Sequence, residues 1–90
     1  MNIKYDELAK YLFSGREIEF SYAGKRYSIT NCKGRWILFC DSDNNLLENI
    51  CTFDERAILV DKIGSYKING NSIHDIFNQE PNLITDIVIL

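Results

Sequence analysis

Residues 17–30, EIEFSYAGKRYSIT, alternate between apolar and polar side chains on both sides of a short turn. The apolar residues that share one face are Ile18, Phe20, Tyr22, Tyr27 and Ile29. Alternation with a period of two, interrupted at Ala23-Gly24-Lys25, predicts an antiparallel hairpin with one buried face. A two-residue loop would pair Phe20 with Tyr27, and a four-residue loop would pair Tyr22 with Tyr27. Both turns leave the same side chains on the buried face, because the two registers differ by two residues.

Further elements are predicted on both sides of the hairpin. A helix from Lys4 to Phe13 has apolar residues at three- and four-residue spacing, and Gly15 ends it. Residues 35–41, RWILFCD, form a third strand whose centre is apolar on both faces. Such a strand is either covered from both sides or part of an exposed patch. A loop at 41–45 leads to a weaker fourth strand, Leu46 to Cys51.

The second half of the chain contains two helix-start signals and a final apolar segment. Thr52-Phe53-Asp54-Glu55 has the pattern of a capping box that opens a second helix to about Ile63, with Gly64 as its stop. Ser72-Ile73-His74-Asp75 repeats the pattern and starts a short helix to about Asn78, which Pro81 cannot continue. Residues 83–90, LITDIVIL, end in four apolar residues that must dock, most simply as an added strand.

These elements predict one α+β domain over residues 1–90. It has an N-terminal helix, an antiparallel meander of three to four strands, two C-terminal helices and an added C-terminal strand. Ninety residues are enough for one modest core. We expect this core to lie beneath the first helix and to contain Ile18, Phe20, Ile29, Trp36 and Leu38.

Composition favours a protein partner over a nucleic acid. The net charge of −3 and the pI of about 5.0 disfavour binding to a phosphate backbone and suit a basic protein surface. No segment has the apolar length of a signal peptide core or a bilayer span. The three cysteines, Cys32, Cys40 and Cys51, match no zinc or C-x-x-C spacing. We therefore expect free thiols, a cytoplasmic location and no membrane partner.

No motif in the sequence points to catalysis, a cofactor or a metal. His74 is the only histidine, and residues one apart, such as His74 and Asp75, do not face each other on a helix. The loop at 41–45 begins like a calcium loop but has Leu46 in place of glycine and Thr52 in place of glutamate. The glycines occur singly, so no phosphate-cradling loop is indicated. We predict a protein that is not an enzyme and has no catalytic, cofactor-binding or metal-binding residues.

Two charged patterns remain as candidate binding features. Basic residues between 25 and 35 lie among Tyr22, Tyr27 and Trp36, an arrangement that can bind single-stranded RNA, although both tyrosines fall on the face expected to be covered. Carboxylates gather on the outer hairpin face and in the later meander, where they add nothing to sheet stability. The predicted partner-binding residues are Glu17, Glu19, Asp41, Asp43, Glu48 and Asp54. Glu55 is set aside because the capping box uses it.

The order of the motifs EIEFSYAGKRYSIT, an acidic loop, TFDE and KINGNSIHDIF resembles a broad group of small bacterial α+β proteins. That group has a helix, an antiparallel meander and a helix, with a closing segment K-I-x-G-x-S-I-x-D-I-[FW]. Some members look like immunity proteins that neutralise a toxin from a neighbouring cell, and phage-encoded anti-defence proteins, anti-CRISPR proteins among them, have similar size and charge. The resemblance covers nearly the whole chain except LITDIVIL, and it implies no catalytic residue.

These observations lead to three functional hypotheses. The first is a non-enzymatic protein-binding inhibitor that occludes a toxin or a defence nuclease through a basic surface of that partner. The alternative is an accessory or regulatory subunit of a bacterial assembly. A less favoured hypothesis is an RNA-binding module that uses the aromatic residues of the sheet.

Overall fold

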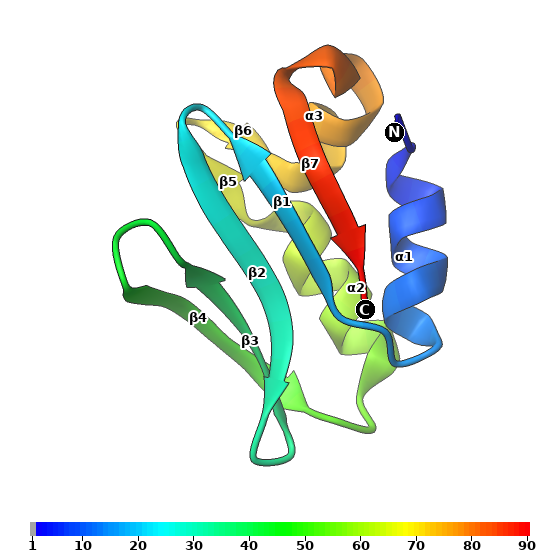
Figure 1. Cartoon of the computed structure of the whole chain (residues 1–90). Helices are drawn as coiled ribbons and strands as arrows, with labels where there is room; N and C mark the ends of the chain where they lie inside the picture. Colours follow the sequence, from blue (N-terminus) through cyan, green and yellow to red (C-terminus); the bar gives the residue numbers. More distant parts are fainter. Residues whose placement is uncertain (1) are drawn as a thin grey trace.

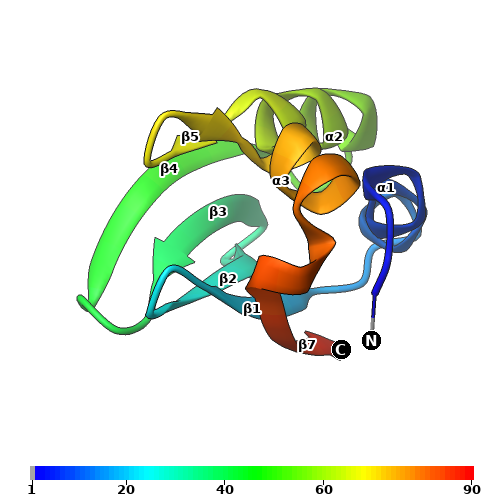
Figure 2. The same ribbon diagram turned by 90° about the horizontal axis from the view of Figure 1, so that it is seen from above.

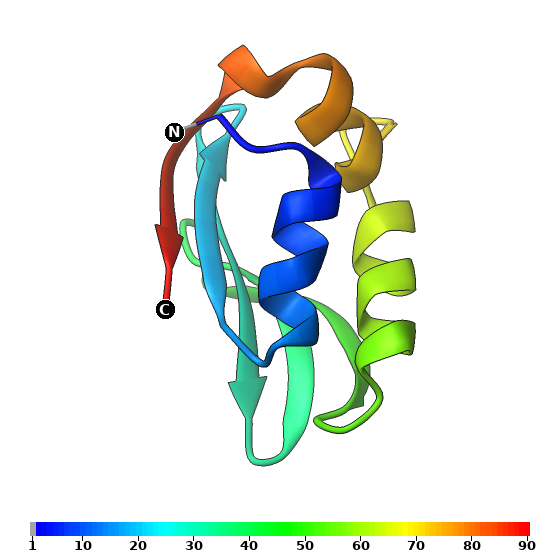
Figure 3. The ribbon, with the colours of Figure 1, turned by 90° about the vertical axis from the view of Figure 1, so that its right-hand side faces the viewer.

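The computed structural model describes residues 2–90, and its main feature is a five-stranded sheet with helices on one face only (Figures 1 and 3). The strand order is β4-β3-β2-β1-β7, and every neighbouring pair is antiparallel. Viewed from above, the sheet curves from β7 towards β4 and the helices lie on its concave side (Figure 2). The predicted α+β fold is therefore confirmed.

The helices and strands follow the predicted order, with small additions. The α-helices are α1 (Tyr5–Phe13), α2 (Arg56–Ser65) and α3 (Ile73–Gln79), and a 3-10 turn, η1, covers Pro81–Leu83. The strands of the large sheet are β1 (Ile18–Tyr22), β2 (Lys25–Cys32), β3 (Arg35–Cys40), β4 (Asn45–Thr52) and β7 (Ile84–Ile89). A separate small hairpin consists of β5 (Lys67–Ile68) and β6 (Asn71–Ser72). None of the helices in residues 2–90 is long and apolar enough to cross a bilayer.

The β1–β2 hairpin adopts the two-residue turn. Tyr22 pairs with Lys25 and Phe20 pairs with Tyr27, which leaves only Ala23 and Gly24 in the loop. Both loop residues have positive φ, 52° at Ala23 and 78° at Gly24. Two successive positive φ angles are the requirement of a type I′ turn, whose twist matches that of paired strands. Glycine tolerates such an angle because it has no Cβ, so Gly24 sets the register that the alternation left open.

The final strand completes the sheet, as the apolar end of the chain predicts. β7 pairs with β1 through Ile89 opposite Ile18 and Ile84 opposite Tyr22, and the Leu90 amide donates to the Glu17 carbonyl at 2.8 Å. The register shifts between these two ends, where Asp86 has a φ of 53°. This bulge lets both halves of β7 stay paired. β1 consequently lies inside the sheet, with β2 and β7 on its two sides.

The core lies between the sheet and the helices and contains every residue predicted for it. The side chains of Ile18, Phe20, Ile29, Trp36 and Leu38 are all fully buried. The Phe20 ring stacks on Tyr27 at 5.5 Å and meets the edge of Phe77 at 5.3 Å, centroid to centroid. Because Phe77 belongs to α3, the third helix shares with α1 the covering of the hairpin. Aromatic pairs in this geometry add to the free energy of burial.

Two helix boundaries differ from the prediction. Thr52 still pairs with Arg35 at the end of β4, and both its amide and its hydroxyl donate to the Glu55 carboxylate, so the capping residues form a turn and α2 begins only at Arg56. Gly64 lies inside α2, which continues to Ser65. A Cβ at Gly64 would come within 3.1 Å of the Tyr5 ring, so this glycine permits close packing of α1 on α2.

Helix α1 receives its cap from the other end of the chain. Lys4 precedes the helix and makes no side-chain cap, whereas the Asn78 side-chain oxygen accepts the Tyr5 amide at 2.8 Å. The Lys4 ammonium also donates to the Asn78 carbonyl at 3.0 Å. An uncapped amide at a helix start loses a hydrogen bond, and Asn78 of α3 supplies it here. The start of α1 is thereby fixed against α3.

We expect Phe20→Ala to lower the free energy of unfolding by about 3–5 kcal/mol, because it leaves a cavity among Tyr27, Phe77 and their neighbours. Phe39→Ala is the matched control, since Phe39 lies on the same sheet but only half-buried on the opposite face. Urea unfolding followed by circular dichroism measures both. Equal losses for the two variants would contradict the assignment of the buried face.

We expect Asn78→Ala to cost about 1 kcal/mol of stability, the usual value of a lost helix cap, and Asn78→Asp to retain most of it because an acceptor oxygen remains. Gln79→Ala, at the neighbouring exposed position of α3, serves as the control. Chemical unfolding of the three variants gives the comparison. A loss at Gln79→Ala as large as that at Asn78→Ala would show that the cap is not the cause.

Candidate protein-binding face

The face of the sheet turned away from the helices is open, and we call it the open face (Figure 3). Its central row crosses all five strands in register: Val88, Glu19, Ser28, Phe39 and Leu46. Val88 is 39% exposed and Leu46 is 50% exposed. Large apolar side chains thus stand at both sides of the row, with the Glu19 carboxylate and the buried Ser28 hydroxyl between them, and a mixture of apolar and charged groups is typical of protein-binding surfaces.

Two further rows flank the central one. Thr30, Ile37 and Asn49 lie opposite one another on β2, β3 and β4, next to Glu17 at the start of β1. On the other side, Ser21 pairs with Arg26 and with Thr85, and the Asp41 amide donates to the Arg26 carbonyl at 2.8 Å. No helix in residues 2–90 covers the second apolar face of the third strand, and Ile37 and Phe39 are half-buried there. Of the two interpretations of its sequence, the uncovered face is the one observed.

Three of the six predicted partner-binding carboxylates lie on the open face. The Glu17 carboxylate accepts from the Thr30 hydroxyl and from the Asn31 amide, the latter at 2.7 Å. The Asp41 carboxylate accepts from the Ser28 hydroxyl at 2.7 Å. These donors are neutral, so they fix the positions of the two carboxylates without cancelling their charges. Groups held in place before a partner arrives lose little freedom on binding.

Glu19 differs from its two neighbours because it has a cationic partner. The Arg26 guanidinium lies 3.4 Å from the Glu19 carboxylate and also donates to the Ser21 hydroxyl and, at 2.6 Å, to the Asp86 carbonyl. One side chain of β2 therefore connects β1 to the bulge of β7 across the open face. Its planar group with several donors suits this bridging role better than an ammonium would.

The other three predicted carboxylates lie elsewhere. Asp43 is in the turn after β3 and pairs with Lys25 at 2.6 Å, and this hydrogen bond holds the pKa of Asp43 below its ordinary value. Glu48 on β4 lies opposite Leu38, whose side chain faces the core. Asp54 is exposed in the turn before α2. The structure thus groups Glu17, Glu19 and Asp41, and it places Asp43, Glu48 and Asp54 around the β3–β4 side of the sheet.

The apolar members of the open face were not among the predicted site residues. The third strand is apolar on both faces, which indicates Ile37 and Phe39 as candidates. The sequence does not select them as site residues, because it leaves open whether the second face is covered or exposed. Val88 and Leu46 could not be identified from the sequence, because the bulge in β7 and the register shifts in β4 determine which way they point.

The aromatic residues, the histidine and the cysteines that were considered for RNA binding, catalysis or metal binding all have structural surroundings in the fold. Tyr22, Tyr27 and Trp36 are buried beneath the helices, so these rings are not available for base stacking in this fold. His74 lies 3.2 Å from Asp75 and from Asn78. The cysteines are free thiols, and burial raises the pKa of Cys51, which makes that thiol a poor nucleophile. Within residues 2–90, no group of three or more metal-ligating side chains occurs.

We expect Arg26→Met to loosen β7, because the substitution removes the three guanidinium contacts but keeps the apolar stem. Amide hydrogen exchange of residues 87–89 should accelerate, and the free energy of unfolding should fall by about 1–3 kcal/mol, the usual range for hydrogen bonds to a charged group. Lys25→Met, which removes only the half-exposed pair with Asp43, is the control. Unchanged exchange in β7 would contradict the bridging role.

Comparison of the chain with protein-family models, with curated proteins and with solved structures found no significant match. The resemblance to small bacterial α+β proteins therefore stays a prediction. The open face is the surface that bears on function, through its apolar row and the two carboxylates bound by neutral donors.

Proposed function

We propose that this protein is a non-enzymatic protein-binding inhibitor that covers a basic surface of its partner with the open face. A toxin or a defence nuclease is the kind of partner that the proposal favours, because both commonly present basic surfaces to nucleic acid. The observation that carries the proposal is the central row, in which Val88, Phe39 and Leu46 share one exposed face with fixed carboxylates.

Charge supports a basic partner. Arg26 compensates Glu19, but within residues 2–90 only a hydroxyl and an amide donate to the Glu17 carboxylate, and only a hydroxyl donates to the Asp41 carboxylate. Arg35, a second described cation on this face, lies near the β2–β3 turn at the same end of the sheet as Glu17, and its guanidinium donates to Asn49 at 2.8 Å. The two negative charges therefore remain to attract a cationic surface, in a protein whose net charge is also negative.

The shape of the face supports occlusion rather than recognition of a single side chain. Five paired strands form a rigid support, and side chains on strands are positioned more firmly than those on loops. Phe39 lies on β3, one strand in from the β4 edge, with Ser28 and Leu46 on its two sides. Half-buried aromatic side chains within a mixed surface are frequent binding hot spots.

The test begins with affinity capture from a lysate of the cell that encodes the protein, followed by purification of the captured partner. The decisive measurement is a titration of the partner's own activity. We expect inhibition that is complete at one molecule of inhibitor per molecule of partner. Binding without inhibition would favour the alternative, an accessory or regulatory subunit, and the absence of any stoichiometric protein partner would contradict the proposal.

Variants then locate the binding surface. Phe39→Ser should weaken binding by about tenfold or more, as expected at a hot spot, whereas Ile58→Ser, 42% exposed on α2, should not. The double variant Glu17→Gln with Asp41→Asn keeps one acceptor oxygen on each side chain but removes the two negative charges. Its association rate should depend less on salt than that of the wild type. Equal salt dependence, or a larger effect of Ile58→Ser, would remove the open face from the interface.

A further inference from the structure

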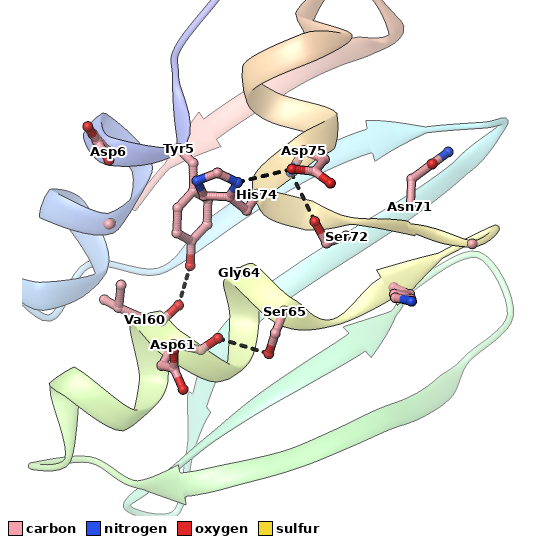
Figure 4. Close-up of a pocket in the computed structure, with 13 residues that line it drawn as sticks. Tyr5, Asp6, Val60, Asp61, Gly64, Ser65, Asn71, Ser72, His74 and Asp75 are labelled. Atoms are coloured by element: carbon pink, nitrogen blue, oxygen red, sulfur yellow. Dashed lines mark hydrogen bonds and ion pairs between the residues drawn. The ribbon is translucent and has the colours of Figure 1, made fainter.

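A groove of about 690 Å³ lies on the helical side of the molecule, away from the open face (Figure 4). It is formed by α1, α2, the start of α3 and the β5–β6 hairpin, and its volume lies in the range of about 300–1,000 Å³ that is typical of small-ligand sites. Gly70 at its rim has nothing within 4 Å of the position where a Cβ would stand, so the groove is open there. Neither the packing of the core nor the proposed function accounts for it.

One wall of the groove consists of two aromatic rings in fixed positions. The centroids of Tyr5 and His74 are 5.4 Å apart, with the ring planes at 58°. The Tyr5 hydroxyl donates to the Val60 carbonyl at 2.5 Å, and the His74 ring lies beside Asp75 (Figure 4). The Asn78 side-chain oxygen accepts from the Tyr5 amide, so the Asn78 NH₂ group faces His74 Nε2. The two ring nitrogens thus lie 3.2 Å from Asp75 and from Asn78, which fixes the orientation of the ring.

Three carboxylates from three different helices line the same groove. They are Asp6 of α1, Asp61 of α2 and Asp75 of α3, and the single lysine beside them is Lys67. The Asp6 and Asp61 side chains form no hydrogen bond or ion pair with any residue from 2 to 90. Burial of the Tyr5 side chain is the main cause that raises the pKa of its phenol, and the negative charge of nearby Asp61 raises this pKa further. The groove therefore has an excess of negative charge next to an aromatic wall.

We propose that this groove binds an alkyl guanidinium or alkylammonium group. The methylene chain would lie along Tyr5, Ala9 and Val60, and the cation would lie between Asp6 and Asp61, within reach of the Tyr5–His74 wall. Carboxylates satisfy the donors of such a cation, and an aromatic ring attracts it through the negative charge of its face. The same chemistry is offered by a free amine such as spermidine and by an arginine or lysine side chain of a polypeptide.

The test is an NMR titration of the isotope-labelled full chain with butylguanidinium, and with butylurea as the uncharged molecule of equal size. We expect saturable shifts for the amides of Ser65, Gly70 and Asn71 with butylguanidinium only, and none at Phe39 on the open face. Spermidine and a blocked Gly-Arg-Gly peptide distinguish the two sources, because tighter binding of one of them identifies it. Shifts that never saturate, or equal shifts with butylurea, would overturn the proposal.

Variants give the second arm of the test. Asp61→Asn should weaken binding of butylguanidinium by about two- to fivefold, the size expected for a partly exposed ion pair, and Asp6→Asn combined with it should weaken binding further. Glu7→Gln is the matched control, since it removes one charge from the same turn of α1 but does not line the groove. An effect of Glu7→Gln as large as that of Asp61→Asn would show only general charge attraction and would overturn the site.

Discussion

Burial of one face of the β1–β2 hairpin is the constraint on which the rest of the structure depends. The rings of Phe20 and Tyr27 stack on that face, and α3 reaches it through Phe77. A single sheet with one apolar face needs one covering layer, and the three helices provide it (Figure 3). The alternation of β1 then leaves Glu19 and Ser21 on the opposite side, so the composition of the open face follows from the burial of the other one.

Three side chains connect helices and strands that are distant from one another in the sequence. Asn78 links the third helix to the first turn of α1, and Arg26 links the second strand to the last. Arg56 stacks 4.2 Å from the Phe53 ring and donates to the Phe13 carbonyl, which joins the start of α2 to the end of α1. Each of these side chains satisfies backbone groups that are far away in the sequence, where no local cap or pairing partner exists.

Much of the fold could be predicted from the sequence because its signals are local. The period of two in residues 17–30 predicts which apolar side chains of β1 and β2 are buried. The predicted Ser72 cap is also observed, because the Asp75 backbone amide donates to the Ser72 hydroxyl. Signals that depend on distant contacts could not be interpreted in the same way. Gly64 resembles a helix stop, but it lies inside α2, where its missing side chain leaves room for the Tyr5 ring. The Thr52–Glu55 hydrogen bond of the predicted capping box stabilises a turn instead of a helix start, because Thr52 is the last residue of β4.

The candidate site was predicted less completely for the same reason. Glu17 and Glu19 could be identified as outward-facing and Asp41 as a residue of the acidic loop. The grouping of these residues with Val88 depends on β7, whose register contains the bulge at Asp86. The groove could not be predicted at all. Asp6, Asp61 and Asp75 are ordinary surface residues of three separate helices, and only the packing of those helices brings them around Tyr5.

The pairing of β7 with β1 also has a consequence for the kinetics of folding. The meander from β1 to β4 consists of contacts between neighbouring segments, which close small loops and form early. The β1–β7 ladder joins Ile18 to Ile89 and therefore closes a much longer loop, which costs more chain entropy. Without β7, β1 would be an edge strand with free backbone donors and acceptors, and such an edge is where a second chain can pair or exchange strands.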